Sequence, residues 1–178
     1  DGKIRRLGDT GEWDGTRWRS LSVAGPSPRN GAAEVFDPRR AVVVLVGGRA
    51  EAGTSSETWA FDGVRWSDGL PASPEGIFNC ALAYDEARSR VVRFGGYRGK
   101  QRVGETWELD GASWTRVSST GPAPRNHAAM AYDAKRRRIV LFGGHDGERV
   151  FADTWEWDGT RWLLRETADP QPHADNGH

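Results

Sequence analysis

The sequence has little of several features that define common functional classes. It contains one cysteine, Cys80, which excludes an internal disulfide framework and a cysteine-based zinc site. Its 25 basic side chains balance 25 acidic ones, whereas proteins dedicated to nucleic acids or anionic membranes carry a basic excess. No apolar run approaches the roughly 20 residues that cross a bilayer. These absences favour a chain without a membrane span that does not bind nucleic acid.

Glycine and tryptophan, in contrast, are abundant, with 23 and 9 residues, and many of them recur at a fixed interval of 48 residues. The recurring columns are Gly47-Gly48, Gly95-Gly96 and Gly143-Gly144; Trp59, Trp107 and Trp155; and Trp66, Trp114 and Trp162. The hexapeptide from Trp13 to Trp18 is repeated without change from Trp157 to Trp162, three intervals later. The chain therefore consists of three full repeats preceded by the second half of a fourth.

Each repeat has the pattern of four short strands. In the third repeat we expect strands over residues 126–132, 138–142, 153–157 and 160–166, with a tight two-residue hairpin turn at Asp158-Gly159. No stretch shows a sustained helical period with caps. The predicted fold class is all-β, and tandem units of four antiparallel strands are typical of the blades of a propeller.

The repeat closely resembles the kelch repeat, in which a strand ends at a Gly pair and a Thr-Trp follows after a spacer. A second Trp follows the first after seven residues, as in Trp59 and Trp66, and Pro-x-Pro-Arg-Asn opens the repeats at Pro26 and Pro122. The second repeat departs from this pattern at residues 74–78. The resemblance implies kelch-type β-propeller blades, about three and a half of them: a half-blade over 1–22, blades over 23–68, 69–117 and 118–166, and a polar tail over 167–178.

Three and a half blades cannot close a regular ring, because propellers contain about four to eight. We therefore expect a segment of a larger protein with six or seven blades. Completion by another copy of the chain and an open arc of blades are the alternatives.

The columns that recur in every repeat are expected to serve packing rather than binding. Each Gly pair should end a strand where a neighbouring side chain, most naturally a Trp ring, approaches the backbone. The Trp columns should bury their rings between blades; the alternative, sugar-stacking platforms, does not require an unbroken interval. Two charges interrupt apolar columns, Glu34 and Arg93, and we predict that they pair across the first and second full blades.

The loops after the Gly pairs are equal in length but different in content, which is typical of a binding surface on a constant frame. The expected contacts are Arg49, Tyr97, Arg98, Lys100, His145, Asp146 and Arg149, together with Asn30, Phe78, Asn126 and His127 where the inner strands begin. Arg29 and Arg125 are expected either to brace the blade by bonding loop carbonyls or to contact a ligand. The basic turn tips on the opposite face are expected to be a solvated rim.

His127, His145 and Asp146 could together hold zinc, iron or copper. However, Gly31 and Asn79 take the place of His127 in the other repeats, and we expect neither a metal nor a cofactor.

The resemblance implies a non-enzymatic, protein- or peptide-binding scaffold. The alternative is part of a carbohydrate-active enzyme, similar to sialic-acid mutarotases, with a site at the ring mouth. A copper-radical site like that of related oxidases is excluded, because Cys80 and Tyr84 would lie about 13 Å apart along one strand. A third possibility is an assembly unit whose partner is another copy. Lysine is rare beside arginine, which is typical of GC-rich bacterial genomes, and such repeats favour an extracytoplasmic location.

Overall fold

A computed structural model describes residues 5–165, and every regular element in it is a β-strand. Three four-stranded antiparallel sheets, here called blades 1 to 3, follow one another along the chain, each in up-and-down order. Blade 1 consists of β3 (Ala33–Asp37), β4 (Val42–Val46), β7 (Thr58–Phe61) and β8 (Trp66–Ser67). Blade 2 consists of β9 (Ala81–Asp85), β10 (Arg90–Phe94), β13 (Thr106–Leu109) and β14 (Trp114–Ser118). Blade 3 consists of β15 (Ala129–Asp133), β16 (Arg138–Phe142), β17 (Thr154–Trp157) and β18 (Trp162–Arg165).

A separate two-stranded sheet, the half-blade, is formed by β1 (Thr10–Trp13) and β2 (Trp18–Leu21). Two short hairpins lie in the loops after the first two Gly pairs: β5 (Arg49–Ala50) with β6 (Gly53–Thr54), and β11 (Tyr97–Arg98) with β12 (Gln101–Arg102). The predicted all-β class and the blades of four antiparallel strands are confirmed. None of the residues from 5 to 165 forms a helix that could span a membrane. The predicted tail, residues 167–178, lies outside the described part of the chain.

The strand register repeats with the sequence. Val46 pairs with Thr58, Phe94 with Thr106 and Phe142 with Thr154, each pair one interval from the next. The Asp-Gly hairpins differ slightly from the prediction. Asp158 is the first of the four turn residues: its carboxylate accepts the N–H groups of residues 160 and 161, and its own N–H donates to Arg161 O. The two central residues of the turn are therefore 159 and 160, one position later than predicted.

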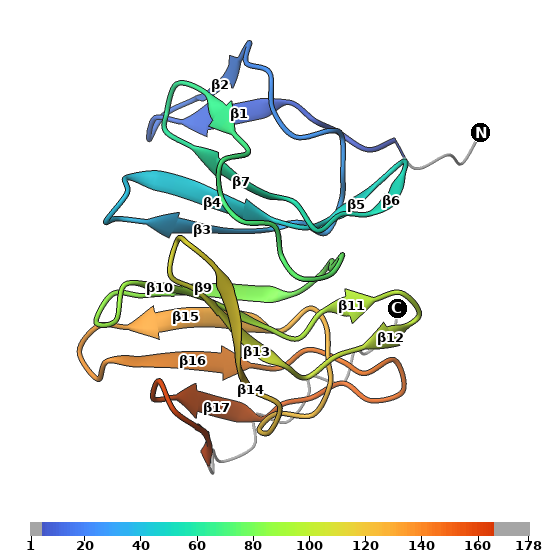
Figure 1. The fold of residues 1–178 in the computed structure, drawn as a ribbon, viewed down its shortest axis with the longest axis vertical. Coiled ribbons are helices and arrows are strands. Elements are labelled where there is room, and N and C mark those ends of the chain that lie inside the picture. Colours follow the sequence, from blue (N-terminus) through green and yellow to red (C-terminus); the bar gives the residue numbers. More distant parts are fainter. Residues whose placement is uncertain (1–4, 166–178) are drawn as a thin grey trace, which may run out of the picture.

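The innermost strands β3, β9 and β15 lie side by side, and the blades fan out from them (Figure 1). Two apolar clusters fill the spaces between blades. Val44 and Val46 of blade 1 pack with Val91 of blade 2, and Phe94 of blade 2 packs with Leu141 of blade 3. Alternation along each strand sends successive side chains to opposite faces of the sheet. Each blade therefore contributes to the cluster on either side of it.

The second Trp of each repeat joins neighbouring blades. The indole N–H of Trp162 donates to Thr106 Oγ1 of the preceding blade at 2.8 Å, and Trp66 donates to Thr10 Oγ1 of the half-blade at the same distance. Trp114 donates to Thr58 Oγ1 of blade 1 at 3.4 Å and to Pro71 O, in the segment between the two blades, at 3.1 Å. The first Trp column behaves differently. Trp59, Trp107 and Trp155 are half-buried, and each donates to a carboxylate two residues earlier on its own chain segment.

The Gly pairs approach a different neighbour from the Trp ring that the sequence led us to expect. A Cβ on Gly47 would lie 2.1 Å from Ile77 O, and a Cβ on Gly95 would lie 2.5 Å from Arg125 O. Both carbonyls belong to the segment that leads into the next blade. The first glycine of these two pairs thus lies where the backbones of consecutive blades almost touch, and both glycines of each pair have a positive φ that suits glycine.

The predicted pairing of Glu34 with Arg93 is wrong. Arg93 is buried, donates to Ser73 Oγ at 2.8 Å and lies over the rings of Trp107 and Trp114. Glu34 is exposed on the outer face of blade 1, which turns away from blade 2. The two residues occupy equivalent faces of successive blades, so the whole blade 1 sheet separates them.

Candidate binding face

The short turns and the longer loops lie at opposite ends of the blades. In Figure 1 the turns after β3, β9 and β15 are on the left, and the hairpins β5–β6 and β11–β12 are on the right. The three loops after the Gly pairs share one backbone bond despite their different sequences: Ser55 N donates to Gly48 O, Val103 N to Gly96 O and Phe151 N to Gly144 O. A constant frame with varied side chains is therefore present at this end.

The residues just before the inner strands, here called mouth residues, are fixed by backbone hydrogen bonds. Asn30 pairs with Arg49, Phe78 with Tyr97 and Asn126 with His145, each through two N–H···O bonds. These six residues were all expected at this face, and the pairing brings each mouth residue against the loop of its own blade.

A second set of bonds links the mouths of neighbouring blades. Asn79 N donates to Gly31 O at 2.7 Å, and His127 N donates to Asn79 O at 3.1 Å. All three residues have positive φ, of 66°, 54° and 57°. Glycine, asparagine and histidine tolerate this left-handed conformation better than most residues. The inner strand of blade 3 consequently begins at Ala129 rather than at residue 126.

Six side chains at the mouths of blades 2 and 3 form two neighbouring contact groups that the backbone pairing of Asn126 with His145 joins, here together called the mouth cluster. Its members are Phe78, Tyr97, Arg102, Asn126, His127 and His145. The ring centroids of Phe78 and Tyr97 are 5.1 Å apart, and the Arg102 guanidinium lies 5.3 Å from the Tyr97 centroid. Arg102 Nε also donates to Asn126 Oδ1 at 3.0 Å. The cluster thus combines aromatic, cationic and amide groups.

The two histidines form the far end of the mouth cluster. Their rings are stacked with centroids 5.2 Å apart, and His127 Nδ1 lies 3.2 Å from His145 Nε2. Partial burial and the nearby His145 and Arg102 lower the pKa of His127. The lowered pKa favours the neutral form of His127, and the contact between the two rings requires one nitrogen to donate and the other to accept.

Asp146 does not turn toward this pair. Its carboxylate accepts the backbone N–H groups of Glu148 and Arg149, which lowers its pKa. Across residues 5–165, no three side chains among His, Cys, Asp and Glu gather in a way that could hold a metal ion. His127, His145 and Asp146 are thus neighbours, but their side chains do not gather around one point.

The remaining residues expected on the loop face are arranged less tightly. Arg98 forms ion pairs with Glu75 at 2.8 Å and Glu105 at 3.2 Å, so its charge is already matched. Lys100 and Arg149 are exposed near the loop tips, and Arg49 is exposed where its loop begins. They lie on the expected face but outside the mouth cluster.

Arg29 and Arg125 brace the blades. Arg125 is 1% exposed, donates to Gly143 O at 3.0 Å and forms a two-pronged pair with Asp153. Arg29 makes the matching bonds to Gly47 O and to Glu57. In blade 2 the same position holds Ile77, which is buried, and Glu105 binds Arg98 and Arg116 instead.

Cys80 lies in the core between blades 1 and 2. Burial raises the pKa of its thiol to about 11, so the reactive thiolate is not populated near neutral pH.

Arg102 is the member of the mouth cluster that the sequence did not reveal. The equivalent positions in the other repeats are Thr54 and Val150, so it belongs to no column. Comparison with models of known protein families gave no match, and comparison with curated proteins gave none either. The repeat register and the mouth cluster are the features that bear on function.

Proposed function

We propose that the chain is a kelch-type propeller segment that binds a protein or peptide through its loop face, without catalysing a reaction. The mouth cluster is the observation that carries this proposal. Tyrosine and arginine are enriched in the residues that contribute most to protein interfaces. Here both are held in fixed positions by stacking and by the bond to Asn126.

Rigidity also supports the proposal. The backbones that carry the cluster are tied to one another and to the next blade by the bonds of Phe78, Asn79, Asn126 and His127. A surface that is already ordered loses little conformational entropy on binding. The varied loop tips around it would then supply specificity.

The test is a selection from a displayed peptide library, followed by measurement of the selected peptides against variants. Tyr97→Ala combined with His145→Ala should weaken binding by at least about tenfold, which corresponds to about 1.4 kcal/mol. Trp18→Ala is the matched control, because Trp18 is an exposed aromatic residue on the half-blade at the turn end. Equal binding by the double variant and the parent chain would refute the proposal, as would a selection without enriched peptides.

A further inference from the structure

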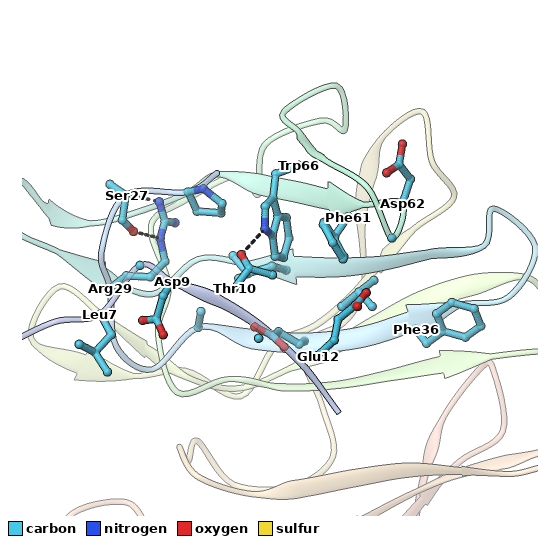
Figure 2. A pocket seen from close by; sticks show the side chains of 18 of the residues that line it. Leu7, Asp9, Thr10, Glu12, Ser27, Arg29, Phe36, Phe61, Asp62 and Trp66 are labelled. Atoms are coloured by element: carbon cyan, nitrogen blue, oxygen red, sulfur yellow. Dashed lines mark hydrogen bonds between the residues drawn. The ribbon is translucent and has the colours of Figure 1, made fainter. Parts of the chain in front are cut away.

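A groove separates the half-blade from blade 1. It has a volume of about 580 Å³ and is lined by β1, by the outer face of β3 and β4, and by the start of β8. Figure 2 shows Thr10 and Glu12 of β1 on one side and Phe36, Phe61 and Trp66 of blade 1 around it. The Trp66–Thr10 bond crosses its outer end.

The half-blade occupies the position of the outer half of a blade. Arg29 N donates to Leu7 O, just as Ile77 N donates to Ser55 O and Arg125 N to Val103 O one and two intervals later. Trp66 likewise binds Thr10 as Trp162 binds Thr106. The contact between half-blade and blade 1 is therefore a continuation of the contacts between complete blades.

The inner part of the same face is uncovered. Phe36 is 54% exposed, whereas Tyr84, one interval later, is 6% exposed because blade 1 covers it. Among residues 5–165, β1 pairs only with β2, while its equivalents β7, β13 and β17 are paired on both edges. An unpaired strand edge beside an apolar floor is a template for strand addition.

The shape of the groove restricts what can fill it. A complete blade from a second copy would collide with the half-blade, which already fills the outer part of the face. Two strands are the matching size, because in blades 1 to 3 two inner strands separate the equivalent of β1 from the centre of the array.

The charge of the groove adds a second restriction. Four carboxylates line it, of which Glu12 pairs with Arg19 and Asp62 with Arg65. Its one guanidinium, Arg29, is committed to Gly47 O and Glu57. Asp9 and Glu34 form no ion pair within the described chain. The groove therefore favours a partner with a net positive charge.

We infer that this groove is the docking site for a separate polypeptide that contributes a β-hairpin with the inner-strand pattern of the repeat and a net positive charge. Its second strand pairs with β1, and its apolar side packs on Phe36, Val43 and Leu45. This inference does not depend on the function proposed for the loop face.

The probe is a synthetic peptide of residues 81–94, the β9–β10 hairpin, which carries three arginines and two acidic residues. In the chain, its Ala83, Val92 and Phe94 cover blade 3, so the same side should cover blade 1 in the groove. Binding is measured by calorimetry, and hydrogen exchange reports on the amides of residues 10–13. We expect binding with slowed exchange in β1.

Matched variants locate the site. Phe36→Asp should weaken peptide binding by at least about tenfold, while Phe142→Asp should change it less than about twofold. Phe142 is a suitable control because it is 44% exposed at the opposite end of the array. In the peptide, Val92→Asp should abolish binding and Val91→Asp should not, because Val91 points to the other face.

Three results would overturn the inference. They are failure of the parent peptide to bind, equal binding by the two peptide variants, and a concentration-dependent dimer of the chain alone that Phe36→Asp dissociates. The last result would assign the groove to a second copy. Sedimentation of the chain without peptide distinguishes it from hairpin docking.

Discussion

Replacing Trp162 by alanine tests the idea that the second Trp column holds the blades together. Trp162 is 8% exposed, its indole N–H donates to Thr106 Oγ1, and its ring packs against Phe94 of blade 2 at a centroid distance of 5.3 Å. Burying such a ring removes about 200 Å² from water, worth about 5 kcal/mol as an upper estimate. Large-to-small substitutions in cores typically cost about 3–5 kcal/mol. We expect Trp162→Ala to lower the free energy of unfolding by about 4 kcal/mol.

Trp18→Ala is the control within the same column. Trp18 is 73% exposed and has no blade before it within the described chain, so its loss should cost less than about 1 kcal/mol. Urea unfolding followed by fluorescence gives both values, provided that the slopes of the transitions agree. If the chain with Trp162→Ala fails to fold, Trp162→Phe should still cost about 1–3 kcal/mol, because Thr106 loses its donor. Equal costs at positions 18 and 162 would refute the reasoning.

The other expected outcomes concern the blade contacts and the turns. Gly95→Ala should lower the free energy of unfolding in urea by about 2–4 kcal/mol, because its Cβ would meet Arg125 O. Gly99→Ala is the control, because Gly99 has a similar φ of 59° but open space around it; it should cost about 1 kcal/mol, and equal costs would contradict a blade contact at Gly95. Arg125→Ala should cost about 3 kcal/mol, because it leaves a carboxylate and a carbonyl without their buried donor, and Arg125→Ile, the residue found there in the second repeat, should cost less. In the folded chain, the bonds from Thr16 and backbone amides lower the pKa of Asp14 to about 2, and similar bonds lower the pKa of Asp62, Asp110 and Asp133. Because these pKa values are lower in the folded state than in the unfolded state, the stability that the turn carboxylates contribute is present above about pH 4 and is lost as the pH falls toward 2. The melting temperature should therefore fall between pH 5 and pH 2. A constant melting temperature over this range would contradict a stabilising role of these aspartates.

Much of the fold could be predicted from the sequence because each repeat solves the same packing problem. The Gly, Trp and Asp columns fix where strands end and turns begin, and local turn chemistry follows from Asp-Gly pairs. The loop face and the pairing of mouth residues with loops, such as Phe78 with Tyr97, also follow from the register. The proximity of His127 and His145 is a consequence of the same antiparallel order.

The tertiary structure alone decided which groups meet across blades. Glu34 and Arg93 were expected to pair because both interrupt apolar columns. Glu34, however, lies on the face of blade 1 that turns away from blade 2, and Arg93 lies on the face of blade 2 that packs on blade 1, so the blade 1 sheet stands between them. Arg102 reaches Asn126 from a neighbouring blade, and no column records it. The Gly47 neighbour is a carbonyl of the next blade rather than a ring. Periodicity along the chain specifies one blade at a time, whereas these contacts depend on the angle and spacing between blades, which the packing of their side chains sets.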